Sequence, residues 1–365
     1  MTITKDQILA ALATVPEPDL KKDLVTLNMI KDIKIDGLNI YFTVILTTPA
    51  CPLKELIKKN CIEAIHRDVN SEANVVIEMI ADVTSIRLGN TALLPGVKNI
   101  IAIASGKGGV GKSTVTCNLA MALSKSGASV GIIDADISGP SIPLMFDVVD
   151  ERPKVDVVDG KNIIIPIMQY GIKLLSIGFL APSDSAIVWR GPMASSALKQ
   201  FIGDADWGTL DYLLFDLPPG TSDIHLTLVQ NLPVTGAIIV TTPQKVALAD
   251  ANKGLAMFAQ PQINVPILGV IENMSYFTPA ELPDNKYYIF GKNGGKELAE
   301  KHQVPFLGEI PLVQSIRESG DSGRPEVMNE SATSESFQHI ASQVAQQVAL
   351  RNANIAPTER VQIKI

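Results

Sequence analysis

The chain has 365 residues, with 31 Lys and Arg against 38 Asp and Glu, a net charge of −7, and 46% hydrophobic residues. This length allows two domains, and an apolar fraction this high beside only 19% charged residues excludes an intrinsically disordered chain. The acidic balance and the lack of a basic block argue against nucleic acid as a partner, because binding it needs clustered Lys and Arg.

Cysteine usage and the absence of long apolar runs indicate the compartment. Cys51, Cys61 and Cys117 are too few for a closed disulfide framework, and none stands in a C-x-x-C spacing. No uninterrupted apolar run reaches the length that spans a bilayer, and the short apolar stretch 8–15 is better explained by a helix than by a signal sequence. We therefore expect a cytoplasmic protein in a reducing compartment, with no membrane partner.

Residues 1–85 predict a small α+β domain in the order helix, strand, strand, helix, strand. The expected elements cover residues 5–15, 25–35, 38–47, 52–69 and 74–79. Thr4 and Gln7 have the spacing of a capping box, and Asp36-Gly37 turns the two strands into an antiparallel hairpin. Residues 86–98 have little periodicity and contain Gly and Pro, so we interpret them as a linker.

Residues 99–365 predict a larger domain of the α/β class. Short β-branched runs alternate with helical stretches, at residues 100–104, 130–134, 212–216, 237–241 and 267–271. Continuous apolar strands separated by helices indicate a doubly wound, mostly parallel sheet covered on both faces, with ligands bound at the carboxyl ends of the strands. A helix over residues 336–350 closes the domain, with one apolar stripe.

A glycine-rich loop follows the first of these strands. Residues 106–114 read Gly-Lys-Gly-Gly-Val-Gly-Lys-Ser-Thr and match the phosphate-loop pattern G-x-x-x-x-G-K-[ST]. The glycines let backbone N–H groups wrap a phosphate chain at a helix N-terminus, Lys112 would reach the β- and γ-phosphates, and Ser113 would bind Mg²⁺. The residues expected to bind ATP here are Gly106, Gly108, Gly109, Val110, Gly111, Lys112, Ser113 and Thr114.

The additional lysine of the loop, Lys107, is not required by the general motif. Because it stands so early in the loop, it cannot easily fold back onto the phosphates of its own chain and is better placed to serve a second subunit. A solvated surface lysine is the alternative. With Lys107, the loop resembles that of the deviant Walker A ATPases, the class of MinD, ParA and the nitrogenase iron protein. The resemblance implies a homodimer in which this lysine reaches the partner's nucleotide.

Two carboxylates complete the predicted catalytic set of Lys107, Lys112, Asp136 and Asp216. Asp216 ends a strand just before Leu-Pro-Pro-Gly-Thr, which fits the Walker B position that holds Mg²⁺ directly or through water. Asp136 is our candidate for orienting the attacking water. Asp134 fits a functional carboxylate and a turn or helix cap equally well. We assign no role to the four histidines, which lack ligand spacing.

The sequence segments around and beyond the loop indicate one family within this class of ATPases. They lie in segments 134–141, 189–192, 211–221, 242–244, 272–275 and 289–291. These segments resemble the Mrp/ApbC family, and the front domain, with Thr-Pro-Ala-Cys-Pro at 48–52, is similar to the domain that precedes the ATPase in many of its members. The resemblance implies an iron-sulfur cluster carrier that binds and hydrolyses ATP as a homodimer and serves apo client proteins.

The same resemblance assigns the base site. It implies that Asn273 contacts adenine at the end of its strand, with Pro243 and Pro311 lining the pocket. An Asn amide offers a donor and an acceptor to an adenine edge, although a strand-end Asn can also cap a turn. The role of Arg190 stays open between reading an anion or a partner carboxylate and forming a salt bridge.

The chain departs from the family at the cluster site. In the family a C-x-x-C pair lies between the Asn-Met-Ser and Phe-Gly motifs, and two chains together supply four thiolates. Here residues 277–290 contain no cysteine, and neither Thr278 nor Glu281 replaces a thiolate well. Cys51 is then either a cluster ligand or transfer thiol, exposed near a helix N-terminus that lowers its pKa, or an inert small hydrophobe.

Three hypotheses of function are compatible with these residues. The first is an ATPase that serves iron-sulfur cluster carriage or assembly. The second is a nucleotide-switched scaffold or positioning protein of the MinD/ParA type, without a cluster. The third is an adaptor that docks clients through residues 1–85 and uses ATP to time their release. A membrane-bound version would need a basic amphipathic helix at the carboxyl end, which residues 352–365 do not provide.

Overall fold

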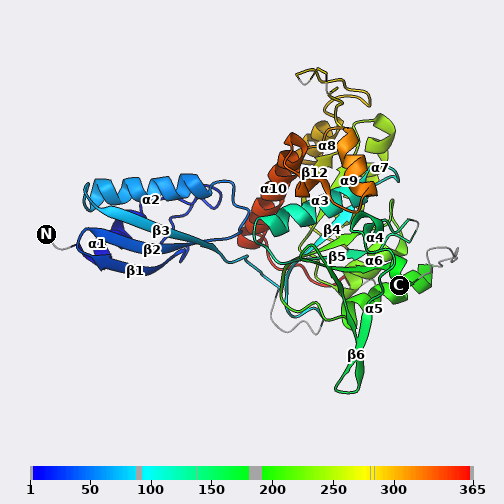
Figure 1. Ribbon diagram of the computed structural model, residues 1–365, viewed down its shortest axis with the longest axis horizontal. Helices are drawn as coiled ribbons and strands as arrows, with labels where there is room; N and C mark the ends of the chain where they lie inside the picture. Colours follow the sequence, from blue (N-terminus) through cyan, green and yellow to red (C-terminus); the bar gives the residue numbers. More distant parts are fainter. Residues whose placement is uncertain are drawn as a thin grey trace. The chain divides into compact units, whose positions relative to one another are not determined.

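The structure is a computed structural model that describes residues 3–87, 93–137, 139–180, 191–279, 281–282 and 284–361 (Figure 1). The chain divides into two compact units, Met1–Thr84 with Ala349–Ile355, and Ser85–Val348 with Ala356–Ile365.

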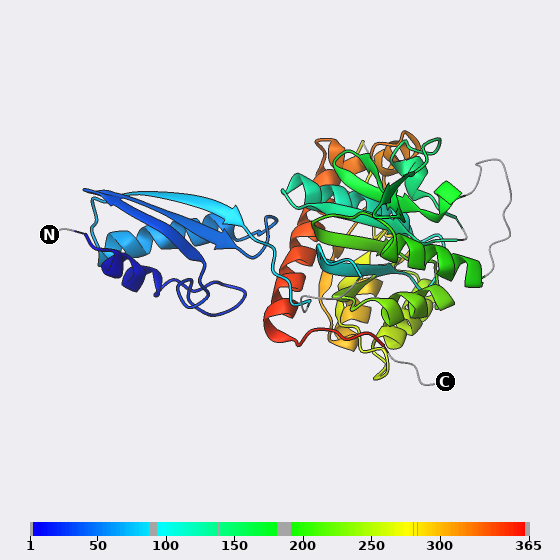
Figure 2. The same ribbon diagram turned by 90° about the horizontal axis from the view of Figure 1, so that it is seen from below.

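The front unit is a three-stranded sheet with two helices. Its elements in chain order are α1 (Lys5–Leu12), β1 (Ile30–Asp36), β2 (Asn39–Leu46), α2 (Lys54–Asp68) and β3 (Asn74–Ala81). β1 pairs antiparallel with β2 and β2 pairs parallel with β3, while both helices cover the same face of the sheet (Figure 2). Ile8 and Leu12 of α1 pack with Ile40 and Phe42 of β2 in one buried cluster. The α+β prediction for this unit is confirmed.

Local hydrogen bonds explain where these elements begin. The predicted capping box is present, because the Thr4 hydroxyl accepts from the Gln7 N–H and the Gln7 side chain accepts from the Thr4 N–H. The first strand begins at Ile30 and not at residue 25, because residues 24–29 form hydrogen-bonded turns.

The large unit contains the remaining elements. They are β4 (Val97–Ala104), α3 (Lys112–Lys125), β5 (Val130–Asp134), α4 (Ile142–Met145), β6 (Lys154–Val158), β7 (Lys161–Ile165), β8 (Ile167–Gln169), β9 (Ile172–Ser176), the 3-10 helix η1 (Ile177–Leu180), α5 (Gly191–Gly203), β10 (Leu210–Asp216), α6 (Asp223–Asn231), β11 (Gly236–Thr241), α7 (Lys245–Phe258), β12 (Ile267–Glu272), α8 (Gly294–His302), β13 (Phe306–Glu309), α9 (Gln314–Asp321), the 3-10 helix η2 (Glu326–Met328) and α10 (Ala332–Asn354).

These strands form an eight-stranded sheet in the order β13-β12-β11-β4-β10-β5-β9-β8. All neighbours pair parallel except β8 and β9, which confirms the predicted α/β class with a mostly parallel sheet. Ile100, Ala102 and Ala104 of β4 lie in a core cluster with side chains of α5–α8, whereas α3 packs against the central strands outside that cluster. β4 is thus covered on both sides, as its continuous apolar sequence predicts.

A single side chain holds the described residues just before β4. β4 begins at Val97, inside the stretch 86–98 that we interpreted as connecting sequence. The Arg87 guanidinium donates to the carbonyl groups of Leu93 and Leu94. One long side chain therefore organises backbone that carries no periodic signal.

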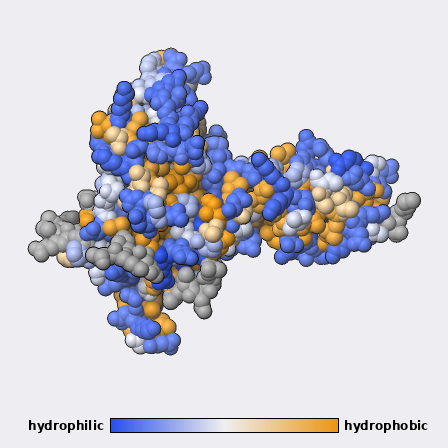
Figure 3. Space-filling model, turned by 180° about the vertical axis from the view of Figure 1, so that it is seen from behind, coloured by the Kyte–Doolittle hydropathy of each residue, from blue (hydrophilic) through white to orange (hydrophobic). Residues whose placement is uncertain are grey.

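A two-stranded hairpin projects from the large unit. β6 and β7 pair antiparallel, and the hairpin extends away from the main sheet (Figure 1). Val155, Val157 and Val158 are exposed on β6, and Figure 3 shows hydrophobic residues on this projection. None of the helices in the described part of the chain is both long and apolar enough to cross a membrane.

Candidate functional site

The loop between β4 and α3 requires glycine at specific positions. Gly109 and Gly111 both have φ of +80°, a conformation that L side chains rarely adopt. A Cβ at Gly106 would collide with the backbone of Asp250 and Ala251 in α7, and one at Gly111 would collide with the amide of Asn273. The loop is therefore fixed by close packing on both sides, with the N-terminus of α3 at its end.

A buried charged centre lies behind the loop. Lys112 Nζ is 2.8 Å from Asp216 Oδ2 at the end of β10 and 3.5 Å from Asp136 Oδ2. Burial lowers the pKa of the Lys112 ammonium group, but the nearby carboxylates, Asp216 first, outweigh it and raise the pKa above its ordinary value. Lys112 thus carries a full positive charge at the place where the loop converges.

The donor set beside Lys112 fits Mg²⁺. Ser113 Oγ donates to Asp216 Oδ2 at 2.6 Å, so a hydroxyl and a carboxylate, both hard oxygen donors, face the same point. Mg²⁺ is held in nucleotide sites by one or two such protein groups together with phosphates and water. Thr116 Oγ1 lies 2.7 Å from Asp216 Oδ1 and occupies the other carboxylate oxygen.

The two aspartates after β5 differ in their surroundings. Asp134 is fully buried and accepts hydrogen bonds from the N–H groups of Asp136 and Ile142 and from the Ser176 hydroxyl. Burial, with the nearby Asp216 charge, raises the pKa of the Asp134 carboxyl. Of the two interpretations left open for Asp134, this geometry supports the one in which it organises the turn, and the turn directs Asp136 toward Lys112.

Lys107 lies on the open side of the same pocket. Its backbone carbonyl accepts from the Ser105 hydroxyl, while its side chain is exposed and forms no ion pair among the described residues. The phosphate-side pocket of about 230 Å³ includes Lys107 and Asp136 in its walls. That Lys107 reaches the nucleotide of a partner subunit stays a prediction.

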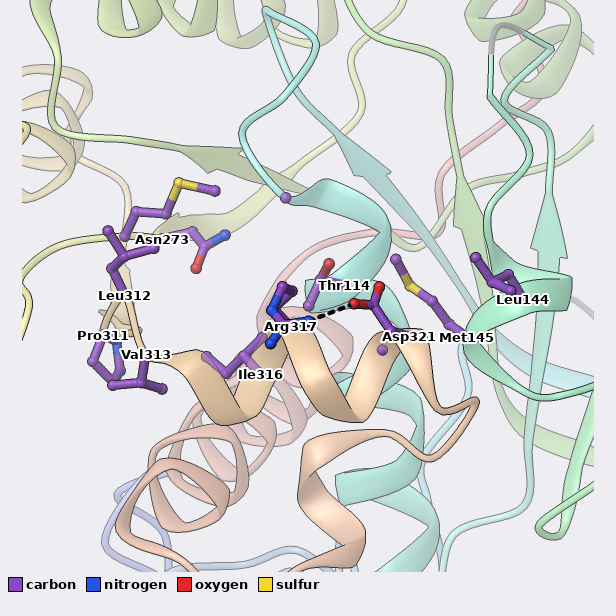
Figure 4. Close-up of a pocket in the computed structure, with 13 residues that line it drawn as sticks. Thr114, Leu144, Met145, Asn273, Pro311, Leu312, Val313, Ile316, Arg317 and Asp321 are labelled. Carbon is purple, nitrogen blue, oxygen red and sulfur yellow. Dashed lines mark hydrogen bonds and ion pairs between the residues drawn. The ribbon is translucent and has the colours of Figure 1, made fainter. Parts of the chain in front are cut away.

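A second pocket, of about 250 Å³, continues from the first through Gly111, Thr114 and Met145. Its wall consists of Gly111, Thr114, Leu144, Met145, Asn273, Met274, Pro311, Leu312, Val313, Ile316, Arg317, Gly320 and Asp321 (Figure 4). The predicted base-site residues Asn273 and Pro311 both lie in this wall. Pro243 is not in this wall, its carbonyl group lies close to Gly291 and Gly294, and its contact with a base stays a prediction.

Asn273 connects the two pockets. Its Nδ2 donates to the carbonyl of Val110 in the phosphate loop at 2.8 Å, while its backbone N–H donates to Thr241. The side chain therefore braces the loop in addition to lining the second pocket. Its Oδ1 remains as the acceptor available to a ligand.

Sequence reasoning missed the helix α9, which supplies Ile316, Arg317 and Asp321 to the wall of the second pocket. The signal that could have found it is the pair of opposite charges four residues apart, since Arg317 Nη1 lies 3.0 Å from Asp321 Oδ2. Arg190 lies outside the described residues.

The segment that lacks the cysteine pair is an irregular loop between β12 and α8, at the top of Figure 1. Phe277 and Tyr287 exchange two backbone hydrogen bonds of 2.8 Å across it. Its exposed large side chains are Phe277, Leu282, Tyr287, Tyr288 and Ile289. The ammonium group of Lys286 lies 3.8 Å from the ring centre of Tyr276. This loop presents aromatic and aliphatic groups where the family's thiolates were expected.

Of the two interpretations left open for Cys51, its surroundings favour the inert thiol. Cys51 is half-buried, and burial raises the pKa of its thiol by more than the Leu53 N–H lowers it, while Glu17 and Asp19 add smaller effects that also raise it. Cys61 and Cys117 are buried. Within the described ranges, no group of three or more His, Cys, Asp and Glu side chains is arranged to hold a metal ion.

The phosphate loop after the central strand of a parallel sheet, with its lysine on a strand-end aspartate, defines a P-loop NTPase. Residues 96–345 match the family described as NUBPL iron-transfer P-loop NTPase, and residues 5–78 match a family of iron-sulfur cluster assembly proteins. These matches cover both units of the chain.

Relatives along the whole chain give the family. The chain is 45% identical to an iron-sulfur cluster carrier protein of Synechocystis, over 95% of this chain and 99% of that protein. It is 42% identical to a protein of the same name from Escherichia coli, over 93% of this chain and 91% of that protein. The chain therefore belongs to the Mrp/ApbC family of iron-sulfur cluster carrier P-loop NTPases.

A solved structure supports the architecture of the large unit. A nucleotide-binding protein from Archaeoglobus fulgidus, described in complex with ADP, is 35% identical and superposes with a TM-score of 0.57. The match covers 74% of this chain and 96% of that protein.

Proposed function

We propose that this chain binds Mg²⁺-ATP in the two connected pockets, hydrolyses it as a homodimer, and serves iron-sulfur cluster carriage or assembly for apo client proteins. The observation that carries the proposal is the convergence of Lys112, Ser113 and Asp216 behind a glycine loop at the carboxyl ends of parallel strands. Phosphoryl transfer needs mostly positioning and neutralisation of charge, which these groups supply.

The second pocket favours adenine over guanine. Asn273 Nδ2 gives one of its two N–H groups to the Val110 carbonyl, so the side chain offers Oδ1 and the second N–H to a base. Adenine presents an amino donor beside a ring-nitrogen acceptor, which matches this pair, whereas guanine presents two acceptors, O6 and N7, on the same edge. The ADP complex of the Archaeoglobus fulgidus relative is consistent with this preference.

We assign one role in ATP hydrolysis to each residue on the phosphate side of the site. Lys112 neutralises the β- and γ-phosphates, and the N–H groups of the loop hold their oxygens. Ser113 and Asp216 would hold Mg²⁺, which adds positive charge at the phosphates when bound. Asp136, facing Lys112 at 3.5 Å, orients the attacking water. Lys107, exposed beside this pocket, reaches the nucleotide of the partner subunit.

The cluster-related role is supported by the family and by the relatives' names, not by a ligand set in the described residues. Fe–S clusters are held by thiolates, and residues 277–290 have none. Cys51 is therefore the one candidate ligand that we retain, with a thiol that is harder to ionise than usual.

The missing thiolates favour a second candidate function. A nucleotide-switched scaffold or client adaptor without a cluster would need the ATP site but no ligands for iron. The exposed loop around Phe277 and Tyr287 is compatible with such a role, since large apolar side chains on a surface are typical of binding sites.

Two measurements test these proposals. Calorimetric titration of the full chain should show Mg²⁺-dependent binding of ATP and much weaker binding of GTP, and phosphate release should follow ATP alone. Equal affinity for the two nucleotides would contradict the Asn273 assignment, and no binding of either would overturn the ATPase proposal.

Anaerobic reconstitution with iron and sulfide separates the carrier from the scaffold. Iron content and visible absorption are measured for the wild type and for Cys51→Ser, with Cys61→Ser as a matched control at a buried thiol. Iron bound by the wild type and the control but lost in Cys51→Ser supports carriage through Cys51. Absence of bound iron in all three proteins supports the cluster-free function.

A further inference from the structure

A buried carboxylate stands beside the second pocket without a role in the mechanism above. Glu326, the first residue of η2, is 1% exposed and accepts four hydrogen bonds. The donors are the hydroxyl groups of Ser315 (3.0 Å), Ser319 (2.7 Å) and Ser331 (2.8 Å) and the amide of Asn329 (3.1 Å). We call these five residues the Glu326 cluster.

The cluster holds the Glu326 side chain in its charged form. Burial works to raise the pKa of this carboxyl, but the donors together outweigh it and leave the pKa below its ordinary value. Hydrogen bonds to an ionised acceptor are stronger than those between neutral groups, and losing one leaves a buried charge poorly solvated. The position of each donor is therefore well defined.

Two of the four donors come from α9, the helix that forms one wall of the second pocket. Ser315 and Ser319 are one turn apart, so they lie on one side of α9, and both face Glu326. Ile316, Arg317 and Asp321 lie on the side that borders the pocket (Figure 4). The carboxylate thus binds the side of α9 that faces away from the pocket, while Ile316, Arg317 and Asp321 face the pocket.

The next residue of η2 connects to the helix that follows the phosphate loop. The N–H of Val327 donates to Asn118 Oδ1 at 3.0 Å, and Asn118 Nδ2 donates to the Thr114 carbonyl at 2.9 Å. Lys125 Nζ donates to the Val327 carbonyl at 2.7 Å. η2 is therefore attached to α3 through Val327 and to α9 through Glu326, and it sets the distance between the two walls of the pocket.

We propose that Glu326 is a positioning residue that holds α9 in place for the nucleoside part of ATP, without acting on the triphosphate. This inference rests on the ATP-binding function proposed above. It separates the determinants of affinity into the loop and Lys112, which bind phosphates, and the Glu326 cluster, which keeps the base pocket preformed.

The test compares two ligands on the full chain. Affinities for ATP and for inorganic tripolyphosphate, each with Mg²⁺, are measured by calorimetry on the wild type and on the double variant Ser315→Ala/Ser319→Ala. Ser322→Ala is the matched control, because its hydroxyl follows α9 but donates to the Ser319 carbonyl and not to Glu326. Thermal unfolding checks that each variant is folded.

We expect the double variant to lose about tenfold in ATP affinity and less than about twofold in tripolyphosphate affinity, with both unchanged in the control. An equal loss for the two ligands, or no loss for ATP, would overturn the positioning role. If the double variant does not fold, Ser319→Ala and Glu326→Gln replace it, and a smaller loss confined to ATP is expected. A wild type that binds neither ligand would overturn the ATP-binding proposal instead.

Discussion

The nucleotide pocket and the loop 277–290 belong to one unit but differ in completeness. The pocket has its lysine, its hydroxyl and its strand-end carboxylates in mutual contact within a single chain. The loop contains no cysteine where the resemblance implies a pair, and it exposes aromatic side chains. The comparison teaches that a nucleotide site with all its expected groups in contact, together with family membership, does not by itself establish cluster binding.

The largest effect is expected from the centre of the pocket. Replacing Lys112 with Ala removes the cation between Asp136, Asp216 and the phosphates, and we expect ATP hydrolysis to fall by about 10⁴-fold with binding lost. Phosphate release and calorimetry check this. Lys253→Ala, an exposed lysine of α7, is the control and should behave as wild type. Nucleotide binding that survives in Lys112→Ala would contradict the assignment of the phosphate site.

A smaller loss is expected at the edge of the pocket. Lys107→Ala should keep ATP affinity within about threefold but lower the hydrolysis rate by about 10³-fold, because a cation supplied in trans acts on the transition state. Measuring the dissociation constant and kcat separates the two effects. A variant with a normal rate would return Lys107 to the status of a solvated surface residue.

We expect acid to lower the free energy of unfolding through His225, a residue of α6, the helix that follows β10. Burial lowers the pKa of His225 to about 4 from an ordinary 6.5, and its Nδ1 accepts the N–H of Ser222 in the cap of α6. Between these pH values the unfolded chain takes up a proton that the folded chain does not, so the free energy of unfolding falls as pH drops, by up to about 3 kcal/mol.

His225→Gln isolates this contribution, since a Gln at the same position keeps an acceptor for the cap but does not titrate. Urea unfolding at several pH values should give a smaller loss of stability for the variant than for the wild type between pH 6.5 and 4. Parallel pH profiles of the two proteins would show that His225 is not the group responsible.

The smallest expected effect concerns the loop 277–290. Thr278→Cys/Glu281→Cys restores the C-x-x-C spacing, and we expect it to raise the iron retained after reconstitution at least about tenfold over wild type. Thr278→Ser/Glu281→Ser is the matched control without thiolates. Failure of the restored pair to bind iron would mean that the aromatic loop differs from the family in backbone conformation as well as in ligands.

The sequence was sufficient for the parts of the molecule that local rules determine. The glycine loop, its lysine and the five central strands follow from a motif and from continuous apolar runs, and the family followed from motifs beside them. The outer strands β8, β9 and β13 were missed because three to five residues carry little periodicity.

The other features that the sequence did not predict depend on tertiary contacts. The segment 314–331 is mostly polar, so it did not indicate a helix, yet its serines and asparagine surround Glu326 and place α9 on the pocket. The ionisation of Cys51 depends on burial, which neighbouring residues in the sequence do not reveal.

The contact between Asn273 and the Val110 carbonyl restricts any redesign of nucleotide preference. Exchanging Asn273 for Asp would be the simplest attempt to accommodate a different base. That exchange would remove the loop's donor and set a carboxylate against a carbonyl oxygen at 2.8 Å, so the loop itself would be displaced. A GTP-specific version of this protein would first need a new support for residue 110, built from a different side chain.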